Sequence, residues 1–214
     1  MGGVTPRGAA RRDQLVEATA VLVAERGYHR VGVDDIGAAA GVSGAAIYRH
    51  FAGKQELLVA VIERAVDALL GNARTIVARS PDARAALDGL IGAHVTFALT
   101  QTALITVYDQ EAHNLAEDER RRLRRQQRAY GDLWVDALAR LAPGRTRAEL
   151  EVVVHGVFGL LNSVADHHRL LDDADEGRLL HEMAAAAFRA SERSAKEDSG
   201  GERGFGRQDA DSVT

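Results

Sequence analysis

The stretch GVSGAAIYRHFAGKQELL, residues 41–58, decides the fold of this chain. It places three glycines around a short apolar turn and then crowds four polar or aromatic side chains together, namely Tyr48, Arg49, His50 and Lys54. An amphipathic helix would space its polar residues along one face, so a hydrophobic core alone does not require this arrangement. The neighbouring segments have to explain it.

Helical segments are expected on both sides of the turn at Gly41. Residues 11–26 carry apolar residues on one helical face and end at Gly27, and residues 33–40 repeat the helical spacing with two acidic residues in the first turn. A third helix is expected over residues 44–50, with Ser43 as its N-cap candidate. Two short helices joined by a tight turn that contains glycine make a helix-turn-helix.

In this motif the second helix enters the major groove of DNA. Small residues at its start let the backbone approach the bases, while the aromatic and basic residues that follow reach phosphates or a guanine edge. The candidate DNA-binding residues are Ser43, Gly44, Ala45, Ala46, Tyr48, Arg49, His50 and Lys54. The alternative is a helical hairpin whose polar face is merely solvated.

Five short motifs follow one another through residues 11–58. They read Arg26-Gly27-Tyr28, Asp34-Asp35-Ile36, Ala40-Gly41-Val42-Ser43, Tyr48 to Phe51, and Lys54 to Leu57. Together they resemble the DNA-binding domain of the TetR family of transcriptional regulators. The resemblance implies an all-α fold, a homodimer, a palindromic double-stranded DNA operator and a small-molecule effector.

The chain departs from the family pattern at two places. Many members carry a hydroxyl residue just before the second helix and a Lys or Arg after the serine, whereas this chain has Val31-Gly32 and Gly44. These departures remove two candidate DNA contacts, which affects the operator sequence but not the fold.

Composition supports the same class. The 214 residues are 46% hydrophobic, hold only three prolines and lack cysteine, so an all-helical chain without disulfides is expected. No apolar leader and no membrane-length segment is expected, and the predicted location is the cytoplasm. Residues 1–60 carry a net charge of about +1 out of a total of −4, which fits a small DNA contact on an acidic body.

The resemblance divides the chain into four parts. They are a flexible N-terminus (1–10), a helix-turn-helix DNA-binding domain (11–55), a helical ligand-binding and dimerisation domain (56–193) and a disordered tail (194–214). The helix that starts at Lys54 leaves the DNA-binding domain and enters the second domain, so we expect it to transmit movement between them. Further helices are expected at about 82–100, 103–115, 117–141, 146–170 and 177–191.

A ligand cavity is expected inside the second domain. Residues 104–138 resemble a pattern of actinobacterial members of the family, some of which sense acyl-coenzyme A thioesters or other lipid-like molecules. The predicted ligand-binding residues are Phe97, Leu104, Tyr108, Glu111, Arg124, Arg128, Trp134 and Phe158. The arginine run from Arg120 could hold phosphates at the cavity mouth, although such a run is more commonly a solvated helix face. A hydrophobic drug or aromatic metabolite would fit the same walls.

The segment 146–170 carries more apolar surface than one side of a helix needs. In the TetR family the last two long helices build a dimer interface, and the predicted interface residues are Val153, Gly156, Val157, Leu160, Leu161 and Val164. Burial within one subunit is the alternative for the half of the helix that faces inward.

No catalytic residue, cofactor or metal site is expected. Asp109 and His113 stand four residues apart and could share a metal or a proton relay, but a pocket rim or a surface ion pair is the commoner meaning. A second candidate metal cluster lies near a helix end, where adjacent side chains point in different directions: Asp166, His167, His168, Asp172 and Asp173. The alternative function is a helical small-molecule-binding protein or enzyme with no sequence-specific DNA role, which would explain only the second domain.

Overall fold

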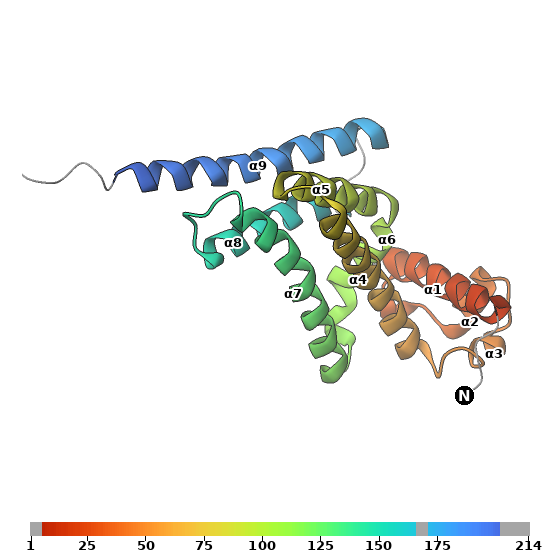
Figure 1. Cartoon of the computed structure of the whole chain (residues 1–214). Coiled ribbons are helices and arrows are strands. Elements are labelled where there is room, and N and C mark those ends of the chain that lie inside the picture. Colours follow the sequence, from red (N-terminus) through yellow and green to blue (C-terminus); the bar gives the residue numbers. More distant parts are fainter. Residues whose placement is uncertain (1–5, 166–170, 202–214) are drawn as a thin grey trace, which may run out of the picture.

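The computed structural model describes residues 6–165 and 171–201, and from residue 193 onward only the backbone. Every regular element in these ranges is helical, as expected (Figure 1). The α-helices are α1 Pro6–Arg26, α2 Val33–Ala39, α3 Gly44–Ile47, α4 Lys54–Arg79, α5 Ala83–Thr100, α6 Thr102–Glu111, α7 Glu117–Ala139, α8 Arg147–Asn162 and α9 Asp173–Gly201. Three short 3-10 turns, η1 Tyr28–Arg30, η2 Ala112–Asn114 and η3 Ser163–Ala165, connect them.

The N-terminal part, α1 to α3 with the start of α4, forms a small core of its own. Leu15, Ile36 and Ile47 are fully buried in it, and Phe51 closes it behind α3. Apolar residues of α6 and α7 join the same core, so the N-terminal part packs directly on the rest of the chain. We call α1–α3 with the start of α4, up to Leu58, the head, and the rest of α4 with α5–α9 the body.

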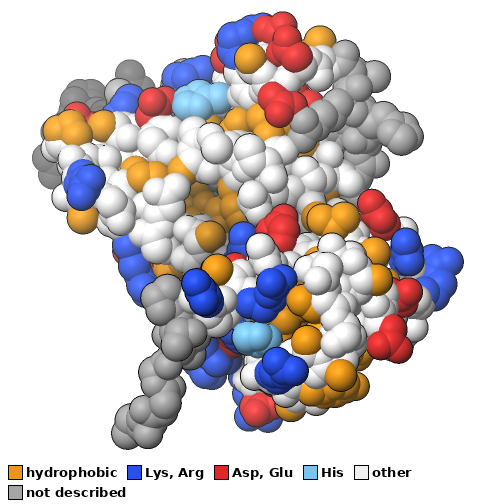
Figure 2. Space-filling model, turned by 90° about the vertical axis from the view of Figure 1, so that its right-hand side faces the viewer, with side chains coloured by type: hydrophobic (Ala, Val, Ile, Leu, Met, Phe, Trp, Pro, Cys, Tyr) orange, Lys and Arg blue, Asp and Glu red, His pale blue; other side chains and the backbone are white. Residues whose placement is uncertain are grey.

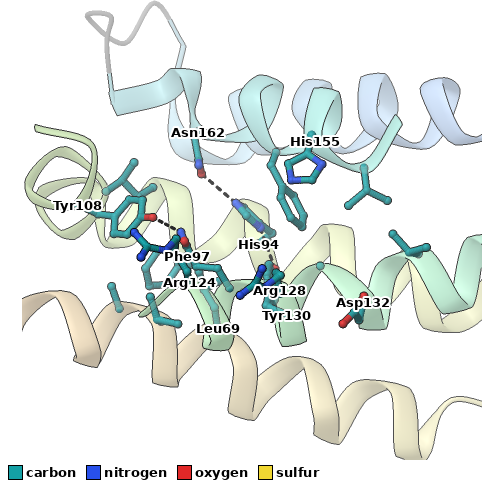
Figure 3. Close-up of a pocket in the computed structure, with 18 of the residues that line it drawn as sticks. Leu69, His94, Phe97, Tyr108, Arg124, Arg128, Tyr130, Asp132, His155 and Asn162 are labelled. Carbon is teal, nitrogen blue, oxygen red and sulfur yellow. Dashed lines mark hydrogen bonds between the residues drawn. The ribbon is translucent and has the colours of Figure 1, made fainter. Parts of the chain in front are cut away.

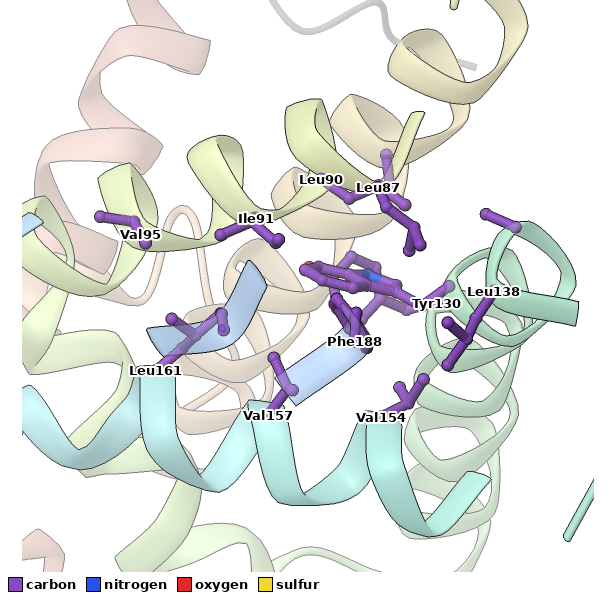
Figure 4. Packing of buried hydrophobic residues seen from close by; sticks show 14 of the residues in the cluster. Leu87, Leu90, Ile91, Val95, Tyr130, Leu138, Val154, Val157, Leu161 and Phe188 are labelled. Atoms are coloured by element: carbon purple, nitrogen blue, oxygen red, sulfur yellow. The ribbon is translucent and has the colours of Figure 1, made fainter. Parts of the chain in front are cut away.

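A second core fills the far end of the body. Trp134 of α7 is fully buried in it, with Phe188 of α9 packed beside it at a ring-centroid distance of 6.0 Å. Figure 4 shows leucine, isoleucine and valine side chains of α5 and α8 around Tyr130 and Phe188. Helix α4 runs between the two cores, with Leu58 buried in the first and Leu70 in the second.

Several helix ends differ from the sequence prediction. Helix α1 begins at Pro6 rather than at residue 11, because proline is well suited to the first turn of a helix. Helix α9 continues to Gly201, past the expected end near 191, through the good helix formers Ala195, Lys196 and Glu197. Residues 1–5 and 202–214 lie outside the described ranges.

Helix α3, the second helix of the helix-turn-helix and its recognition helix, is also shorter than expected. Helix α3 ends at Ile47, and the amide of His50 then donates to the carbonyl of Ile47 at 2.8 Å, three residues back. Such bonds tighten the last turn of a helix. Tyr48, Arg49 and His50 therefore lie on a tight turn after α3 rather than within it.

Candidate functional site

The outer side of the head displays the side chains expected to meet DNA. Ser43, Ala45, Tyr48 and Arg49 are exposed, while Gly44, Ala46, His50 and Lys54 are half-buried. Tyr48 is the most prominent, with 60% of its surface exposed although it is a large aromatic residue. Ile47 and Phe51 anchor the segment from the opposite side. The head thus holds its candidate DNA-binding residues on a rigid support.

Helices α2 and α3 approach each other closely, and glycine permits it. A Cβ on Gly37 would lie 2.9 Å from the amide nitrogen of Gly44, and a Cβ on Gly44 would lie 2.0 Å from Asp34 Oδ1. The turn between the helices passes through Gly41, whose φ of 66° favours glycine. The Asp34 carboxylate therefore occupies the space that a side chain at position 44 would need.

Lys54 is held in place at the start of α4. Its ammonium lies 4.1 Å from the ring centroid of Tyr28, and the Tyr28 hydroxyl donates to Gln55 Oε1 at 2.9 Å. Burial lowers the pKa of Lys54, an effect that the nearby Glu111 carboxylate opposes. The cation–π contact fixes the direction of this candidate phosphate-binding ammonium.

Two arginines of α1 also face the helix-turn-helix, and the predicted set of DNA-binding residues omits them. The Arg12 guanidinium lies 4.5 Å above the Phe51 ring, and Arg11 donates to the carbonyl of Ala40 at 3.4 Å. In the sequence, the positive charge of these two arginines is the only feature that points to DNA binding. Figure 2 faces this end of the molecule and shows Lys and Arg side chains separated by uncharged surface rather than merged into one basic field.

A cavity of about 610 Å³ lies in the body between α4, α5, α6, α7 and α8. Six of the eight predicted ligand-binding residues line it, namely Phe97, Leu104, Tyr108, Arg124, Arg128 and Phe158 (Figure 3). The rest of its apolar wall includes Ala65, Val66, Leu69, Ile105, Val135 and Val154. Its volume falls within the range of small-molecule sites, and its mostly apolar wall with a few polar groups is typical of them.

The other two predicted ligand-binding residues do not line the cavity. Trp134 is fully buried in the body core, edge-on to Phe158 at a ring-centroid distance of 5.2 Å. Glu111 points toward the head, where its carboxylate accepts from the amide of Tyr28 at 2.8 Å and from Asn114 Nδ2 at 2.7 Å. Both therefore lie outside this cavity wall, because the direction of each side chain depends on packing that its own helix does not reveal.

A chain of three polar side chains from three helices closes one end of the cavity, and the sequence analysis missed it. His94 is 97% buried from solvent, with Nδ1 at 2.8 Å from the Tyr130 hydroxyl and Nε2 at 2.9 Å from Asn162 Oδ1. Burial lowers the pKa of His94, and the bond to Asn162 partly offsets this effect. His94 also stacks on Phe158 at a ring-centroid distance of 5.3 Å. At neutral pH this end of the cavity is therefore uncharged.

The wall of the cavity also carries arginine. Arg124 pairs with Glu117 at 2.9 Å, and Arg120 and Arg121 pair with the same carboxylate, whose pKa these bonds lower to about 2. Arg128 has no ion-pair partner within the described ranges. Much of the arginine run is thus a solvated, internally paired helix face, whereas Arg128 is available to an anion.

Helix α6 connects the cavity to the head. Its Leu104 and Tyr108 lie in the cavity wall, where Tyr108 accepts a hydrogen bond from Gln127 and where burial raises the pKa of Tyr108. One turn later Glu111 holds the backbone of Tyr28. A shift of α6 would consequently move both the cavity wall and the contact with the head at Tyr28.

Two family models cover much of this structure. Residues 15–61 match the model of bacterial regulatory proteins of the tetR family, and residues 80–169 match the model of the tetracycline-repressor-like C-terminal domain. The chain belongs to the TetR family. It is accordingly a transcriptional regulator and not an enzyme.

The curated relatives of this chain include both a repressor and an activator of transcription. The chain is 30% identical over 146 residues to the HTH-type transcriptional repressor KstR2 of Rhodococcus jostii RHA1, covering 67% of this chain and 72% of that protein. It is 39% identical over 96 residues to the HTH-type transcriptional activator FasR of Mycolicibacterium smegmatis, covering 45% and 43%.

A solved structure of AibR in complex with isovaleryl coenzyme A and operator DNA has the same fold. The TM-score is 0.70 at 18% identity, over 81% of this chain and 97% of that one.

The outer face of α8 differs from the predicted TetR dimer interface. Val157, Leu161 and Val164 are buried in the core of their own subunit, so they are unable to meet a partner. Val153 and Leu160 are half-buried and Gly156 is exposed. The exposed apolar side chains near them are Val152 of α8, at 73% exposure, and Leu179 and Met183 of α9, at 39% and 52%.

This apolar exposure also makes α8 resemble a membrane helix by composition. Together with η3, the segment Arg147–Ala165 is long and apolar enough to span a membrane, at a mean hydropathy of 1.3. Helices α5 and α6 pass the same test jointly but are bent by 85° at their junction. One or two such segments are weak evidence, because helices at the core of a soluble protein pass this test too.

Residues 6–165 and 171–201 contain no group of three His, Cys, Asp or Glu side chains placed to hold a metal ion. Residues 166–168 of the second candidate metal cluster lie outside these ranges.

Proposed function

We propose that this chain is a cytoplasmic repressor that binds a palindromic operator as a homodimer and is released by a small amphipathic effector. The single observation that carries the proposal is the position of the cavity. Its wall includes residues of α4 and α6, two of the helices that also reach the head. A ligand in the cavity therefore acts on two connections to the DNA-binding surface.

Operator binding is proposed to use residues 33–54 of each subunit. Dimers of this motif read two half-sites about one DNA turn, or a multiple of it, apart. The spacing of the two heads then decides the affinity for the operator. A ligand lowers this affinity only if it binds better to a state with a different head spacing.

The proposed effector carries an apolar body and an anionic group, as an acyl-coenzyme A does. Apolar walls and Phe158 suit the body of such a ligand, and Arg128 with Arg124 at the wall suits phosphates, to which arginine binds in a bidentate manner. The ligand of AibR, isovaleryl coenzyme A, supports this class. The name of KstR2 as a repressor supports the sign of regulation.

The experiment measures operator affinity with and without effector. Saturating decanoyl-coenzyme A is expected to weaken binding to a palindrome from the chain's own promoter at least tenfold. Arg128→Ala should reduce the response, whereas Arg125→Ala, on the same exposed helix but outside the cavity wall, should not. An unchanged operator affinity with decanoyl-coenzyme A, decanoate and aromatic compounds would refute the effector-release proposal.

Dimerisation is proposed to use the exposed apolar side chains of α8 and α9, with Val152 and Met183 as its anchors. Helices α8 and α9 pack against each other, so exposed apolar side chains of both can contribute to one interaction surface. Met183→Glu should yield a monomer in analytical ultracentrifugation at micromolar concentration. Val21→Glu, at a position of α1 that is 41% exposed, is the matched control and should leave the dimer intact.

A further inference from the structure

A second, smaller cavity lies between α4 and α5. Its volume is about 330 Å³, and we call it the α4–α5 groove. Ala68, Asn72 and Thr96 of its wall are exposed, so the groove opens to solvent. Ala73 and Leu90 of the same wall are buried apolar residues, and none of the described residues that line the groove is charged. The groove therefore presents an uncharged and partly apolar surface.

Three side chains form the wall between this groove and the larger cavity. Leu69 of α4, Phe97 of α5 and Tyr130 of α7 line both spaces (Figure 3). Side chains that line two neighbouring cavities separate one from the other. A ligand in the larger cavity is therefore kept out of the groove by these three residues.

Phe97 is the least restrained aromatic side chain of this wall. The Tyr130 hydroxyl forms a hydrogen bond with His94 Nδ1 at 2.8 Å, and the Tyr130 ring stacks on Phe158 at a centroid distance of 5.3 Å. Phe97 is half-buried, packs against apolar residues of both cores, and has no aromatic ring partner among the described residues. Its ring is also larger than the side chain of Leu69. The residue at position 97 therefore decides how completely the two spaces are separated.

The two spaces differ in charge. Arg124, Arg128, Asp132 and Glu151 all line the larger cavity, whereas the described wall of the groove is uncharged. An anionic group in the groove would find no cation in that wall. An alkyl chain gains about fourfold in affinity for each methylene that it buries. The apolar part of a ligand is thus the part suited to extend past Phe97.

We propose that Phe97 sets the longest alkyl chain that the effector can carry. An unbranched acyl chain ends against Phe97, and a smaller residue at this position admits a longer chain into the α4–α5 groove. This inference rests on the proposed function, because it concerns the apolar part of the same effector.

The test measures binding of octanoyl-coenzyme A and hexadecanoyl-coenzyme A to the full chain by isothermal titration calorimetry. The ratio of the two affinities separates a limit on chain length from a general loss of binding. In Phe97→Ala the ratio of hexadecanoyl to octanoyl affinity should rise at least about tenfold over the wild type, as expected for two or more additional buried methylenes. An unchanged ratio, or no binding of either thioester to the wild type, would overturn the inference.

Phe97→Leu is the second variant and keeps an apolar side chain against both cores. Its ratio should lie between those of the wild type and Phe97→Ala. If Phe97→Ala does not fold, an unchanged ratio in Phe97→Leu overturns the inference instead.

A further substitution tests whether the longer chain enters the groove. Ala93 lies one turn before Phe97 on α5 and lines the groove but not the larger cavity. Adding Ala93→Leu to Phe97→Ala fills the groove, so the ratio should return toward the wild-type value. A ratio that stays high in the double variant would place the longer chain elsewhere and would overturn the inference.

Operator affinity is measured separately in the presence of octanoyl-coenzyme A. If the affinity ratio changes as expected while operator affinity stays unchanged, the limit set by Phe97 stands and the proposed release of DNA fails.

Discussion

The head and the body place their functional side chains in opposite ways. In the head, Tyr48 and its neighbours stand outside a small core and are exposed to solvent. In the body, His94 and Phe158 stand between helices and pack on the rings that form the core. Changes on the head should therefore affect DNA binding with little effect on folding, whereas changes around the cavity should affect ligand binding and stability together.

The largest expected effect tests this contrast directly. Trp134→Ala removes a fully buried ring that packs against Tyr130, Phe158 and Phe188, so it should lower the free energy of unfolding by about 3–5 kcal/mol. Tyr48→Ala should change it by less than about 0.5 kcal/mol, because the ring is mostly exposed. Urea denaturation followed by circular dichroism measures both. Similar losses in the two variants would contradict the separation between head and body.

A smaller effect is expected where the head and the body meet. Glu111→Ala removes the acceptor of the Tyr28 amide and of Asn114, so it should lower the free energy of unfolding by about 1–3 kcal/mol. Glu111→Gln keeps one acceptor oxygen and is the matched control, with a smaller loss. Thermal and urea unfolding measure both variants. If effector release of DNA persists unchanged in a folded Glu111→Ala variant, α6 does not couple cavity and head.

On the head alone, Lys54→Ala is expected to weaken binding to all DNA sequences and to lower the salt dependence of binding by about one unit of slope. Its free energy of unfolding should fall by no more than about 1 kcal/mol, because the half-buried ammonium loses one cation–π contact, with Tyr28. Arg140→Ala, an exposed cation of the body, is the control and should leave the slope unchanged. The measurement is a fluorescence-anisotropy titration of operator DNA at several salt concentrations.

The smallest effect concerns the surface arginine run. The bonds from Arg120, Arg124 and Arg121 hold the pKa of Glu117 at about 2, below its usual 4.5. A lowered carboxyl pKa stabilises the fold above the unfolded value, and this contribution is lost as pH falls from about 4.5 to 2. Carboxyl chemical shifts from NMR should show the low pKa, and Arg120→Ala should raise it. The effect on stability is small because the group is exposed to solvent.

The same contrast explains what the sequence could predict. The helix-turn-helix lies within about 50 consecutive residues whose turn glycines, caps and small residues are local signals, so its helices and its exposed residues were predictable. The cavity is assembled from five helices. Phe97, Leu104 and Tyr108 were predicted to line it, but the bonds of His94 join residues 36 and 68 positions away along the chain, and no local pattern reveals them.

Helix α8 shows why three residues of the predicted dimer face are buried within their own subunit. Val152, Val153, Val154 and Val157 place apolar residues on nearly all sides of the helix. Periodicity then does not tell the buried side from the exposed one, and only the positions of α5, α7 and α9 decide that Val157 and Leu161 face inward. For the same reason the direction of Glu111 depended on where the head docks.

The contact between Gly44 and Asp34 has a consequence for changing the operator preference of this protein. Any side chain introduced at position 44 would collide with the Asp34 carboxylate unless that carboxylate moved, since the distance from an added Cβ to Oδ1 would be 2.0 Å. A basic residue there would gain its DNA contact once the Asp34 side chain rotates away, or together with a smaller residue at position 34. A library of recognition-helix variants should therefore vary positions 34 and 44 jointly.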